Sequence, residues 1–191
     1  NGCDKNAVNI IIPDEIEGKP VTIIDWYAFE RCEKLRSVVI PDTVTHISRF
    51  AFAHCISLET VNMPKFLYSI EQYAFYDCPK LIGVDLPDSL HIIEERAFCG
   101  CKSISDLIIP EKSIGNYAFL DCDSLYTVTI NGEDTSFGIK YIGYEYDNGY
   151  KIKDGFLLIS GSKNAADYAN DNGIDLILEM IKGGVDADGS F

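Results

Sequence analysis

Seven cysteines are the most conspicuous reactive residues of this 191-residue chain. Five of them occupy one position of a recurring segment: Cys32, Cys55, Cys78, Cys101 and Cys122. If the segments stack as strands do, about 4.8 Å apart, neighbouring Cα atoms fall within the range of a disulfide. The side chains would run parallel, however, and five members cannot all pair. Because a free cysteine is readily buried, we expect a reduced, buried cysteine ladder, with Cys3 and Cys99 outside it and Cys99 partly exposed.

Histidines and paired acids form no recognisable catalytic pattern. His46, His54 and His91 occupy different positions of the recurring segment, which predicts that they do not converge. Glu94 and Glu95 are adjacent on a turn, where they cannot hold a substrate between two carboxylates. The chain has no HExxH, Gly-rich phosphate loop, GxSxG or CxxC pattern, and its CxC pair is too closely spaced for zinc. We therefore expect no enzyme activity, no cofactor and no intact metal site.

The acidity of the chain excludes further classes of partner. Its net charge is -14 and its pI is near 4.5. Nucleic-acid and anionic membrane surfaces are bound through clustered Lys and Arg, so neither is an expected partner. No apolar run approaches the ~20 residues that span a bilayer, and we expect no membrane insertion. The acidity is typical of a solubilising surface.

The cysteines are positioned by five copies of one segment. The copies begin at Ala28, Ala51, Ala74, Ala97 and Ala118; the central one reads AFYDCPKLIGVDLP. The first four are spaced by 23 residues and the last by 21. A period in the twenties indicates a stacked repeat, in which each unit buries its apolar face only against its neighbours.

The apolar positions of the repeat predict its elements. Around residues 38–40 a V-x-I alternation has a period of two, which indicates a short strand with these side chains inward. Proline ends the strand in four copies. A second apolar pair, such as Val44 and Ile47, crosses the next turn. The Ala-Phe pair then starts a short helical turn. The inward-facing side chains include the row Phe29, Phe52, Phe75, Phe98 and Phe119.

The repeat resembles a known family. Its pattern C-x-x-L-x-x-V-x-I-P-x-x-V-x-x-I-x-x-x-A-F is similar to that of the BspA-like bacterial leucine-rich repeats, and residues 7–130 fit it. The resemblance implies an α/β leucine-rich-repeat solenoid that is right-handed, with a parallel β-sheet on the concave face and short helical turns opposite. It also implies an extracellular or bacterial cell-surface location, and adhesion or protein recognition. Residues 1–130 would be a partial N-terminal repeat and five full ones.

Residues 131–180 predict a C-terminal capping unit. Asn148-Gly149 is a hairpin signal, residues 156–160 indicate a strand, and residues 163–170 a short helix capped by Ser162. Residues 174–180 form a last strand or the start of a helix. The run from Gly161 to Ile174 also resembles the closing unit of BspA-like arrays. Such a unit shields the last coil from water.

The tail, residues 181–191, is rich in Gly and Asp. It is either a disordered polar linker or the truncated start of a dockerin, which it resembles. In the second interpretation Asp186 and Asp188 are calcium ligands and Gly189 makes the sharp turn. Gly184 stands where the first ligand belongs and the closing acidic residue is missing, so no intact calcium site is expected.

Side chains between the inward positions of each strand are free to bind a partner. Six parallel strands would present them over a concave surface about 24 Å long. These candidates are Ser37, Val39, Thr60, Asn62, Gly83, Asp85, Asp106, Ile108, Thr127 and Thr129. Small, uncharged-to-acidic residues suit contact with a protein or a glycan.

A second candidate is the aromatic file before each Ala, formed by Tyr27, Phe50, Tyr73 and Tyr117 and interrupted by Arg96. It is either a ligand platform or edge packing between turns.

Two functions follow from these features. The first is a non-catalytic extracellular solenoid that recognises a protein partner on its concave face and acts in binding or adhesion. The second is a non-catalytic, glycan-associated module of a dockerin-bearing, cellulosome-like protein. The residues after Phe191 in the full gene would discriminate between them, because a dockerin needs a complete calcium loop and a second copy.

Overall fold

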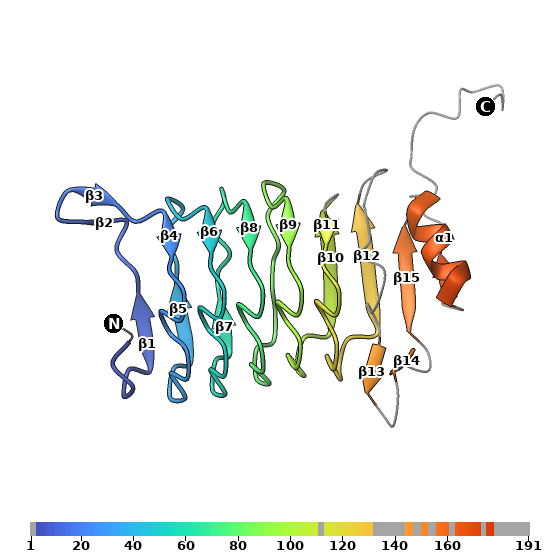
Figure 1. Ribbon diagram of the computed structural model, residues 1–191, viewed down its shortest axis with the longest axis horizontal. Helices are drawn as coiled ribbons and strands as arrows, with labels where there is room; N and C mark the ends of the chain where they lie inside the picture. The colour runs from blue at the N-terminus through green and yellow to red at the C-terminus, as the bar shows by residue number, and fades with distance from the viewer. Residues whose placement is uncertain are drawn as a thin grey trace, which may run out of the picture.

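The computed structural model of the chain is a stack of coils that follow one another along its long axis (Figure 1). It describes residues 3–110, 113–131, 144–146, 150–152, 156–160, 163–172 and 175–177. Successive coils contribute strands to two parallel sheets and close through a turn region. The predicted solenoid of stacked parallel strands is therefore confirmed.

The first sheet is parallel and has two parts. The first part comprises β1 (Asn9–Ile11), β5 (Ser37–Val39) and β7 (Thr60–Val61). The second comprises β10 (Asp106–Pro110), β12 (Thr127–Asn131), β15 (Leu157–Ser160) and β16 (Asp175–Ile177). The strands show the predicted alternation: Val38 is buried and Val39 exposed, and Leu107 is buried and Ile108 exposed.

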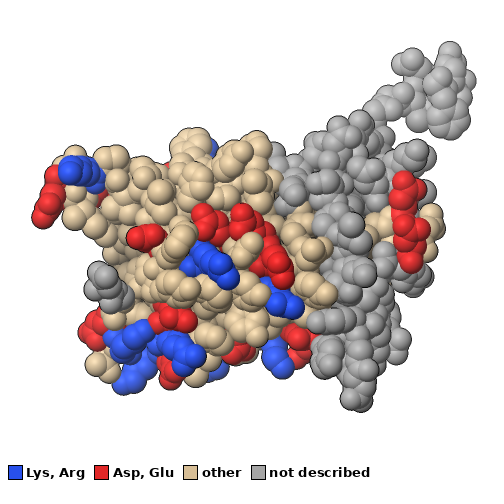
Figure 2. Space-filling view, viewed as in Figure 1, with Lys and Arg blue, Asp and Glu red and all other residues tan. Residues whose placement is uncertain are grey.

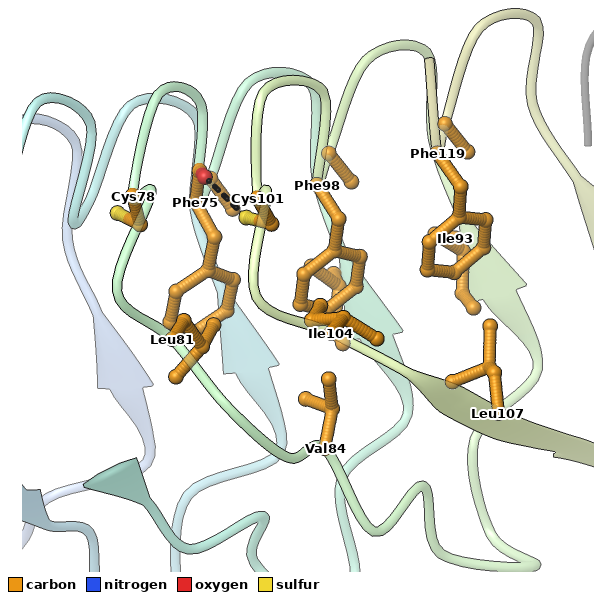
Figure 3. Close-up of a cluster of buried hydrophobic side chains, with 14 of the residues drawn as sticks. Phe75, Cys78, Leu81, Val84, Ile93, Phe98, Cys101, Ile104, Leu107 and Phe119 are labelled. Atoms are coloured by element: carbon orange, nitrogen blue, oxygen red, sulfur yellow. Dashed lines mark hydrogen bonds between the residues drawn. The ribbon is translucent and has the colours of Figure 1, made fainter. Parts of the chain in front are cut away.

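Residues 81–87 form no strand between β7 and β10. This contradicts the expectation of one continuous surface of six strands. Figure 3 shows the chain passing Val84 as coil, whereas Leu107 lies on β10. Leu81 and Val84 are still buried, so the core is continuous where the backbone pairing is not. Gly83 favours the break, because glycine weakens a strand and leaves no side chain to pack. We call this whole surface the interrupted sheet.

A second sheet, which the sequence analysis did not predict, follows each turn. Its parallel strands are β4 (Ile23–Ile24), β6 (His46–Ile47), β8 (Ser69–Ile70), β9 (Ile92–Ile93) and β11 (Ser113–Ile114). The second residue of each strand is a buried isoleucine. Partners such as His46 and Ser69 are 23 residues apart in sequence, and Ile92 and Ser113 are 21 apart.

The Ala-Phe segments are turns and not the short helical turns that the sequence predicted. Alternate backbone N–H groups bond to the next coil, as in Phe52 N–H to Ala74 O at 2.8 Å, and those between them bond three residues back, as in Ala53 N–H to Phe50 O at 3.2 Å. A helix would need these donors for its own i−4 carbonyls. Two residues per segment also have positive φ, such as Tyr73 (60°) and Asp77 (53°). The left-handed conformation at these points prevents a helix from continuing.

The core is built from one phenylalanine per coil. Consecutive rings of Phe29, Phe52, Phe75, Phe98 and Phe119 stack at 5.0–5.2 Å between centroids and within 5° of parallel. Four of these side chains are at most 1% exposed, and Phe29 at the N-terminal end is partly buried. Figure 3 shows three of the rings in line beside the leucine and isoleucine side chains. This confirms the inward position of the phenylalanine row.

Four cysteines of the repeat position are free and buried: Cys55, Cys78, Cys101 and Cys122. Each thiol donates to the carbonyl of the phenylalanine in the preceding coil, at 3.0–3.3 Å. Figure 3 draws this bond from Cys101 to Phe75. Cys99 is also free and buried, so the expectation of partial exposure was wrong.

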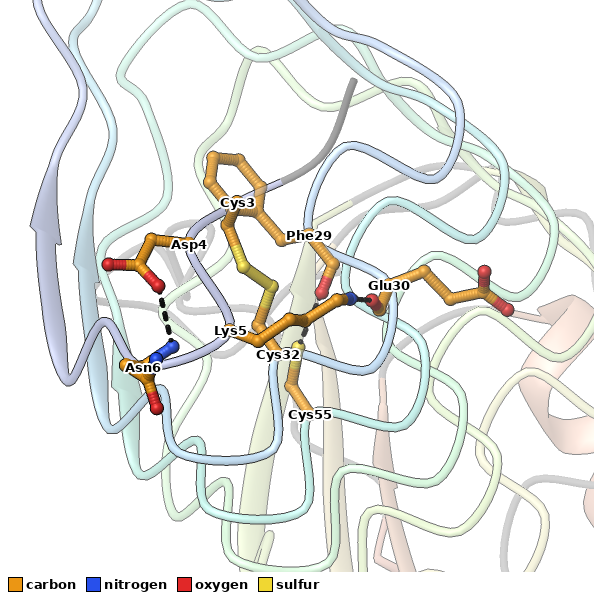
Figure 4. The surroundings of a disulfide bond; sticks show 8 residues. All are labelled: Cys3, Asp4, Lys5, Asn6, Phe29, Glu30, Cys32 and Cys55. Carbon is orange, nitrogen blue, oxygen red and sulfur yellow. Dashed lines mark hydrogen bonds between the residues drawn. A yellow bond between two sulfur atoms is a disulfide. The ribbon is translucent and has the colours of Figure 1, made fainter.

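Cys32 departs from the predicted reduced state. It forms a disulfide with Cys3, whose Cα lies 6.7 Å away (Figure 4). The first full coil offers Cys32 no preceding phenylalanine carbonyl, and the segment before β1 brings Cys3 to that place instead. Beside the disulfide, the Lys5 ammonium donates to the carbonyl of Glu30. A covalent bond therefore closes the N-terminal end of the stack.

Two hairpins and one helix complete the described structure. β2 (Glu15–Ile16) and β3 (Lys19–Pro20) form an antiparallel hairpin in the predicted insertion. β13 (Tyr144–Tyr146) pairs antiparallel with β14 (Tyr150–Ile152) on either side of the predicted hairpin signal. α1 (Lys163–Asn172) includes the predicted helix and runs two residues further. The last predicted element is a strand, β16, which pairs parallel with β15.

Other expectations for the C-terminal part remain predictions. The division into repeats (1–130), cap (131–180) and tail (181–191) is one of them. Asp186 and Asp188, the two residues of the partial calcium loop, lie outside the described residues.

Candidate binding surface on the interrupted sheet

The structure places all ten predicted binding residues on or beside the interrupted sheet. Seven are exposed: Val39, Thr60, Asn62, Gly83, Asp85, Asp106 and Ile108. The other three, Ser37, Thr127 and Thr129, are partly exposed. The buried residues between them hold the core, so these side chains share the outer face of the sheet.

Asn62 is exposed but already engaged. Its side-chain amide accepts from the Ile40 N–H at 2.7 Å and donates to the Ile40 carbonyl at 2.8 Å. One side chain thus takes the two bonds that a neighbouring strand would otherwise make at the end of β5. β7 accordingly ends at Val61, one repeat position before the position at which β5 ends, Val39. The prediction that Asn62 is free to bind a partner is therefore corrected: its amide fixes the local backbone.

The break in the sheet opens a hollow of about 390 Å³. It is lined by Thr60, Val61, Asn62, Met63, Ile82, Gly83 and Asp85. Among the described residues, the single backbone bond that joins residues 82–86 to a neighbouring coil runs from Ile82 N–H to Glu59 O, at 3.2 Å. Because the ladder stops there, the segment separates from β7 and leaves this space.

Exposed aliphatic side chains surround the hollow. Ile82 is 58% exposed and lines it. Val39 and Ile108 are 49% and 59% exposed on the strands at either side. The sequence analysis missed Ile82, because it precedes the V-x-I alternation and its counterparts in neighbouring coils are polar. An aliphatic residue at a position that is Arg, Glu, Ser or Tyr in the other copies was the available signal.

Some charged side chains near the hollow have partners, whereas one carboxylate does not. Arg36 and Glu59 form an ion pair of 2.9 Å. The Asp106 carboxylate accepts from the Ser105 hydroxyl at 3.0 Å. Within the described part of the chain, the Asp85 carboxylate has no hydrogen-bond or ion-pair partner. On the face drawn in Figure 2, acidic and basic side chains of the described residues are interspersed.

The aromatic file is packed against itself. Tyr27 stacks on Phe50 at 5.2 Å between centroids, and Phe50 on Tyr73 at 4.8 Å. The Arg96 guanidinium lies 5.8 Å from the Tyr73 ring and 4.9 Å from the Tyr117 ring, so it continues the file by cation–π contacts. The ring faces are covered by one another. This favours the interpretation as packing between turns over that as a ligand platform.

Two of the three histidines pack on one ring: Tyr68 lies 5.7 Å from His46 and 4.6 Å from His91 between centroids, whereas His54 lies beside Tyr76. His46 Nδ1 lies 2.8 Å from Thr45 Oγ1, and His54 Nδ1 lies 3.2 Å from Asp77 Oδ2. His91 Nδ1 lies 2.7 Å from the Ser89 carbonyl. The structure does not bring the three rings to one site.

Burial favours the neutral form of four free thiols, those of Cys55, Cys78, Cys99 and Cys101. Burial raises the pKa of Cys55 and of Cys99 to about 12, and raises the pKa of Cys78 and Cys101 well above its usual value. A protonated thiol can donate to the phenylalanine carbonyl, as the geometry requires. The thiolate is the nucleophile in cysteine chemistry, so these residues act in packing and not as reagents.

Comparison with known proteins gives this fold a family. A profile described as the BspA type leucine rich repeat region matches residues 22–145 in six copies. The chain belongs to this family. The BspA-type repeat accounts for the rows of buried side chains, whereas the hollow lies where one BspA-type unit fails to make its strand.

Solved structures of leucine-rich repeat proteins share the fold. TpLRR from T. pallidum is 33% identical, with a TM-score of 0.63, over 66% of this chain and 59% of that protein. A leucine-rich repeat protein from Bacteroides ovatus is 25% identical, with a TM-score of 0.59, over 81% and 54%. The pneumococcal vaccine antigen PcpA is 22% identical, with a TM-score of 0.70, over 93% and 42%.

This BspA-type chain thus spans between 42% and 59% of the lengths of these relatives. Curated protein sequences gave no match. Among the described residues, no helix has the length and apolar composition to cross a membrane.

Proposed function

We propose that the chain is a non-catalytic, extracellular protein-binding module that recognises its partner on the interrupted sheet, which we take to be the concave face of the solenoid. The observation that carries the proposal is the combination of exposed aliphatic side chains with a hollow on a surface that the core does not use. Interface centres combine apolar area with well-packed pockets in this way. The repeat family supports a scaffold role.

The disulfide supports the extracellular part of the proposal. Disulfides persist in oxidising compartments and are rare where glutathione keeps thiols reduced. The Cys3–Cys32 bond ties the first segment of the chain to the first full coil. Such a bond is useful to a protein that works outside the cytosol. Adhesion follows if the partner is itself fixed to a surface.

The aromatic file favours a protein partner over a glycan. Glycan binding commonly uses an open aromatic face, and the rings between Tyr27 and Tyr73 cover each other. The side chains around the hollow are aliphatic, amide and carboxylate groups. These side chains give less support to the glycan-associated, dockerin-bearing alternative.

The proposal is tested by a binding screen with a matched pair of variants. The chain, immobilised through its C-terminus, is screened by surface plasmon resonance against matrix proteins, secreted proteins and polysaccharides. Ile108→Glu places a charge on the interrupted sheet, and Ile56→Glu makes the same change at an exposed isoleucine in a turn (59% and 43% exposed).

We expect Ile108→Glu to weaken the binding of a protein ligand at least about tenfold, and Ile56→Glu to leave it unchanged. Equal effects of the two variants would reject the interrupted sheet as the binding surface. A panel that yields polysaccharide ligands alone would reject the protein partner.

A further inference from the structure

The hollow beside Gly83 combines an apolar wall with one uncompensated charge. Val61, Met63 and Ile82 supply aliphatic surface, and Asp85 supplies a carboxylate. At about 390 Å³ the hollow lies near the lower end of the range for ligand pockets. Its size thus suits one long side chain of a partner and not an entire folded element.

The carboxylate of Asp85 favours a positively charged side chain of the partner in this hollow. Its carboxylate has no partner among the described residues, and the chain as a whole carries a net charge of -14. A neutral or acidic side chain would bury part of this carboxylate without compensation, which is unfavourable. A basic side chain would pair with it.

The apolar wall of the hollow favours a long side chain with a methylene stem. Lysine and arginine lay their methylene stems along apolar surface while the charged head reaches a polar partner. Ile82, which is 58% exposed, and the partly buried Met63 offer such a surface next to Asp85. Arginine has the further advantage that its planar fork matches a carboxylate.

We propose that this hollow is a subsite for a basic side chain, preferably arginine, in an extended segment of the protein partner. Its methylene stem packs against Ile82 and the accessible part of Met63, and its cationic head pairs with Asp85. This inference rests on the proposed function and adds the chemistry of the residue that is recognised.

The test uses capped pentapeptides of alternating threonine and valine whose central residue is arginine, citrulline or glutamate. Citrulline keeps the length and shape of arginine and removes its charge. Amide shifts of the ¹⁵N-labelled chain give the dissociation constants and locate the site. Asp85→Asn removes the proposed counter-charge, and Asp88→Asn makes the same change at an exposed carboxylate that does not line the hollow.

We expect the arginine peptide to shift the amides of Ile82, Gly83 and Asp85. Since Asp85 is exposed, the citrulline peptide should bind about three- to tenfold more weakly. Asp85→Asn should abolish this difference, and Asp88→Asn should preserve it. Added salt should weaken the arginine peptide selectively.

Three outcomes would overturn the inference. They are equal affinity of the arginine and citrulline peptides, shifts confined to other parts of the chain, and absence of binding by the arginine peptide. None of them decides the proposed function. That proposal fails separately, if Ile108→Glu and Ile56→Glu affect a protein ligand equally.

Discussion

At the scale of single residues, the structure shows which positions of the repeat admit change. Gly115 and Gly83 illustrate the contrast. A Cβ on Gly115 would lie 2.5 Å from the backbone N of Glu95 in the preceding coil, whereas a Cβ on Gly83 would meet no atom within 4 Å. The two coils that meet at Gly115 are therefore in direct backbone contact. Gly115 also lies in the unit between Ala97 and Ala118, which is two residues shorter than the others.

Gly115→Ala should accordingly destabilise the chain by about 1–3 kcal/mol, because backbone atoms must move to admit the methyl group. Gly83→Ala is the matched control and should change stability by no more than about 0.5 kcal/mol. Urea unfolding monitored by circular dichroism measures both values. Equal midpoints for the two variants would refute the close approach of the coils.

The buried thiols predict a loss of stability at alkaline pH. In the unfolded chain a thiol loses its proton near pH 9, whereas burial raises the pKa of Cys55 and Cys99 to about 12. The unfolded state therefore binds fewer protons between these values, and the free energy of unfolding falls as pH rises. The contribution is fully present below pH 9 and is lost as pH rises through 12.

The measurement is the urea midpoint between pH 8 and pH 11 for the parent chain and for the double variant Cys55→Ala, Cys99→Ala. The parent should lose stability more steeply above pH 9 than the variant. Parallel curves would show that these thiols do not carry the effect.

At the scale of secondary structure, Asn62 replaces part of a strand. Its amide pairs with both backbone groups of Ile40, a residue that is 1% exposed. Asn62→Ala should cost about 1–3 kcal/mol, because both buried backbone groups lose a partner. Thr60→Ala, on the same face, is the control and should cost less than about 0.5 kcal/mol. Thermal unfolding of both variants measures these differences. An Asn62→Ala chain as stable as the Thr60→Ala control would contradict the stabilising role of the Asn62 amide.

The elements differ in how far the sequence predicts them. The strands around Val38 and Leu107 were predictable because their side chains alternate. The second sheet was not, because a two-residue strand such as Ser69–Ile70 has no alternation to read. The break at Gly83 was hidden for a related reason. Val84 keeps its apolar type, and burial of a side chain does not require pairing of its backbone.

The sequence predicts which side of the sheet carries the candidate site, but not the hydrogen bonds and the hollow that shape it. Seven of the ten outward residues lie on strands, where a period of two fixes their side, whereas Asn62, Gly83 and Asp85 lie outside any strand. The role of Asn62 depends on the distance of its amide from Ile40, and no pattern of residue types encodes that distance. The Cys3–Cys32 bond was missed because Cys3 lies outside the repeat.

At the scale of the whole molecule, each coil is stabilised by its neighbours, and the two ends have one neighbour fewer. The disulfide acts at the N-terminal end, across a sequence separation of 29 residues. A loop of this length corresponds to about 3–4 kcal/mol in the chain-entropy treatment.

Cys3→Ser should therefore loosen the first coils and leave the centre unchanged, because repeat interactions are between nearest neighbours. Native-state hydrogen exchange should show faster exchange in the coil of Phe29, and unchanged rates at Phe75 and Phe98. Cys99→Ser, which removes a thiol outside this bond, is the control. A uniform acceleration along the whole chain would reject the nearest-neighbour account.

The left-handed residues at the turns tie each coil to the next. Each coil holds non-glycine residues such as Phe50 and His54 at positive φ, a conformation that is unfavourable in isolation. Their N–H groups bond to the following coil, at Gln72 and Tyr76. Other N–H groups of the same coils bond to the preceding coil, as in Glu59 N–H to Arg36 O at 2.8 Å. Each turn is therefore held by the layers beside it, and removal of one coil should relax the turns of its neighbours.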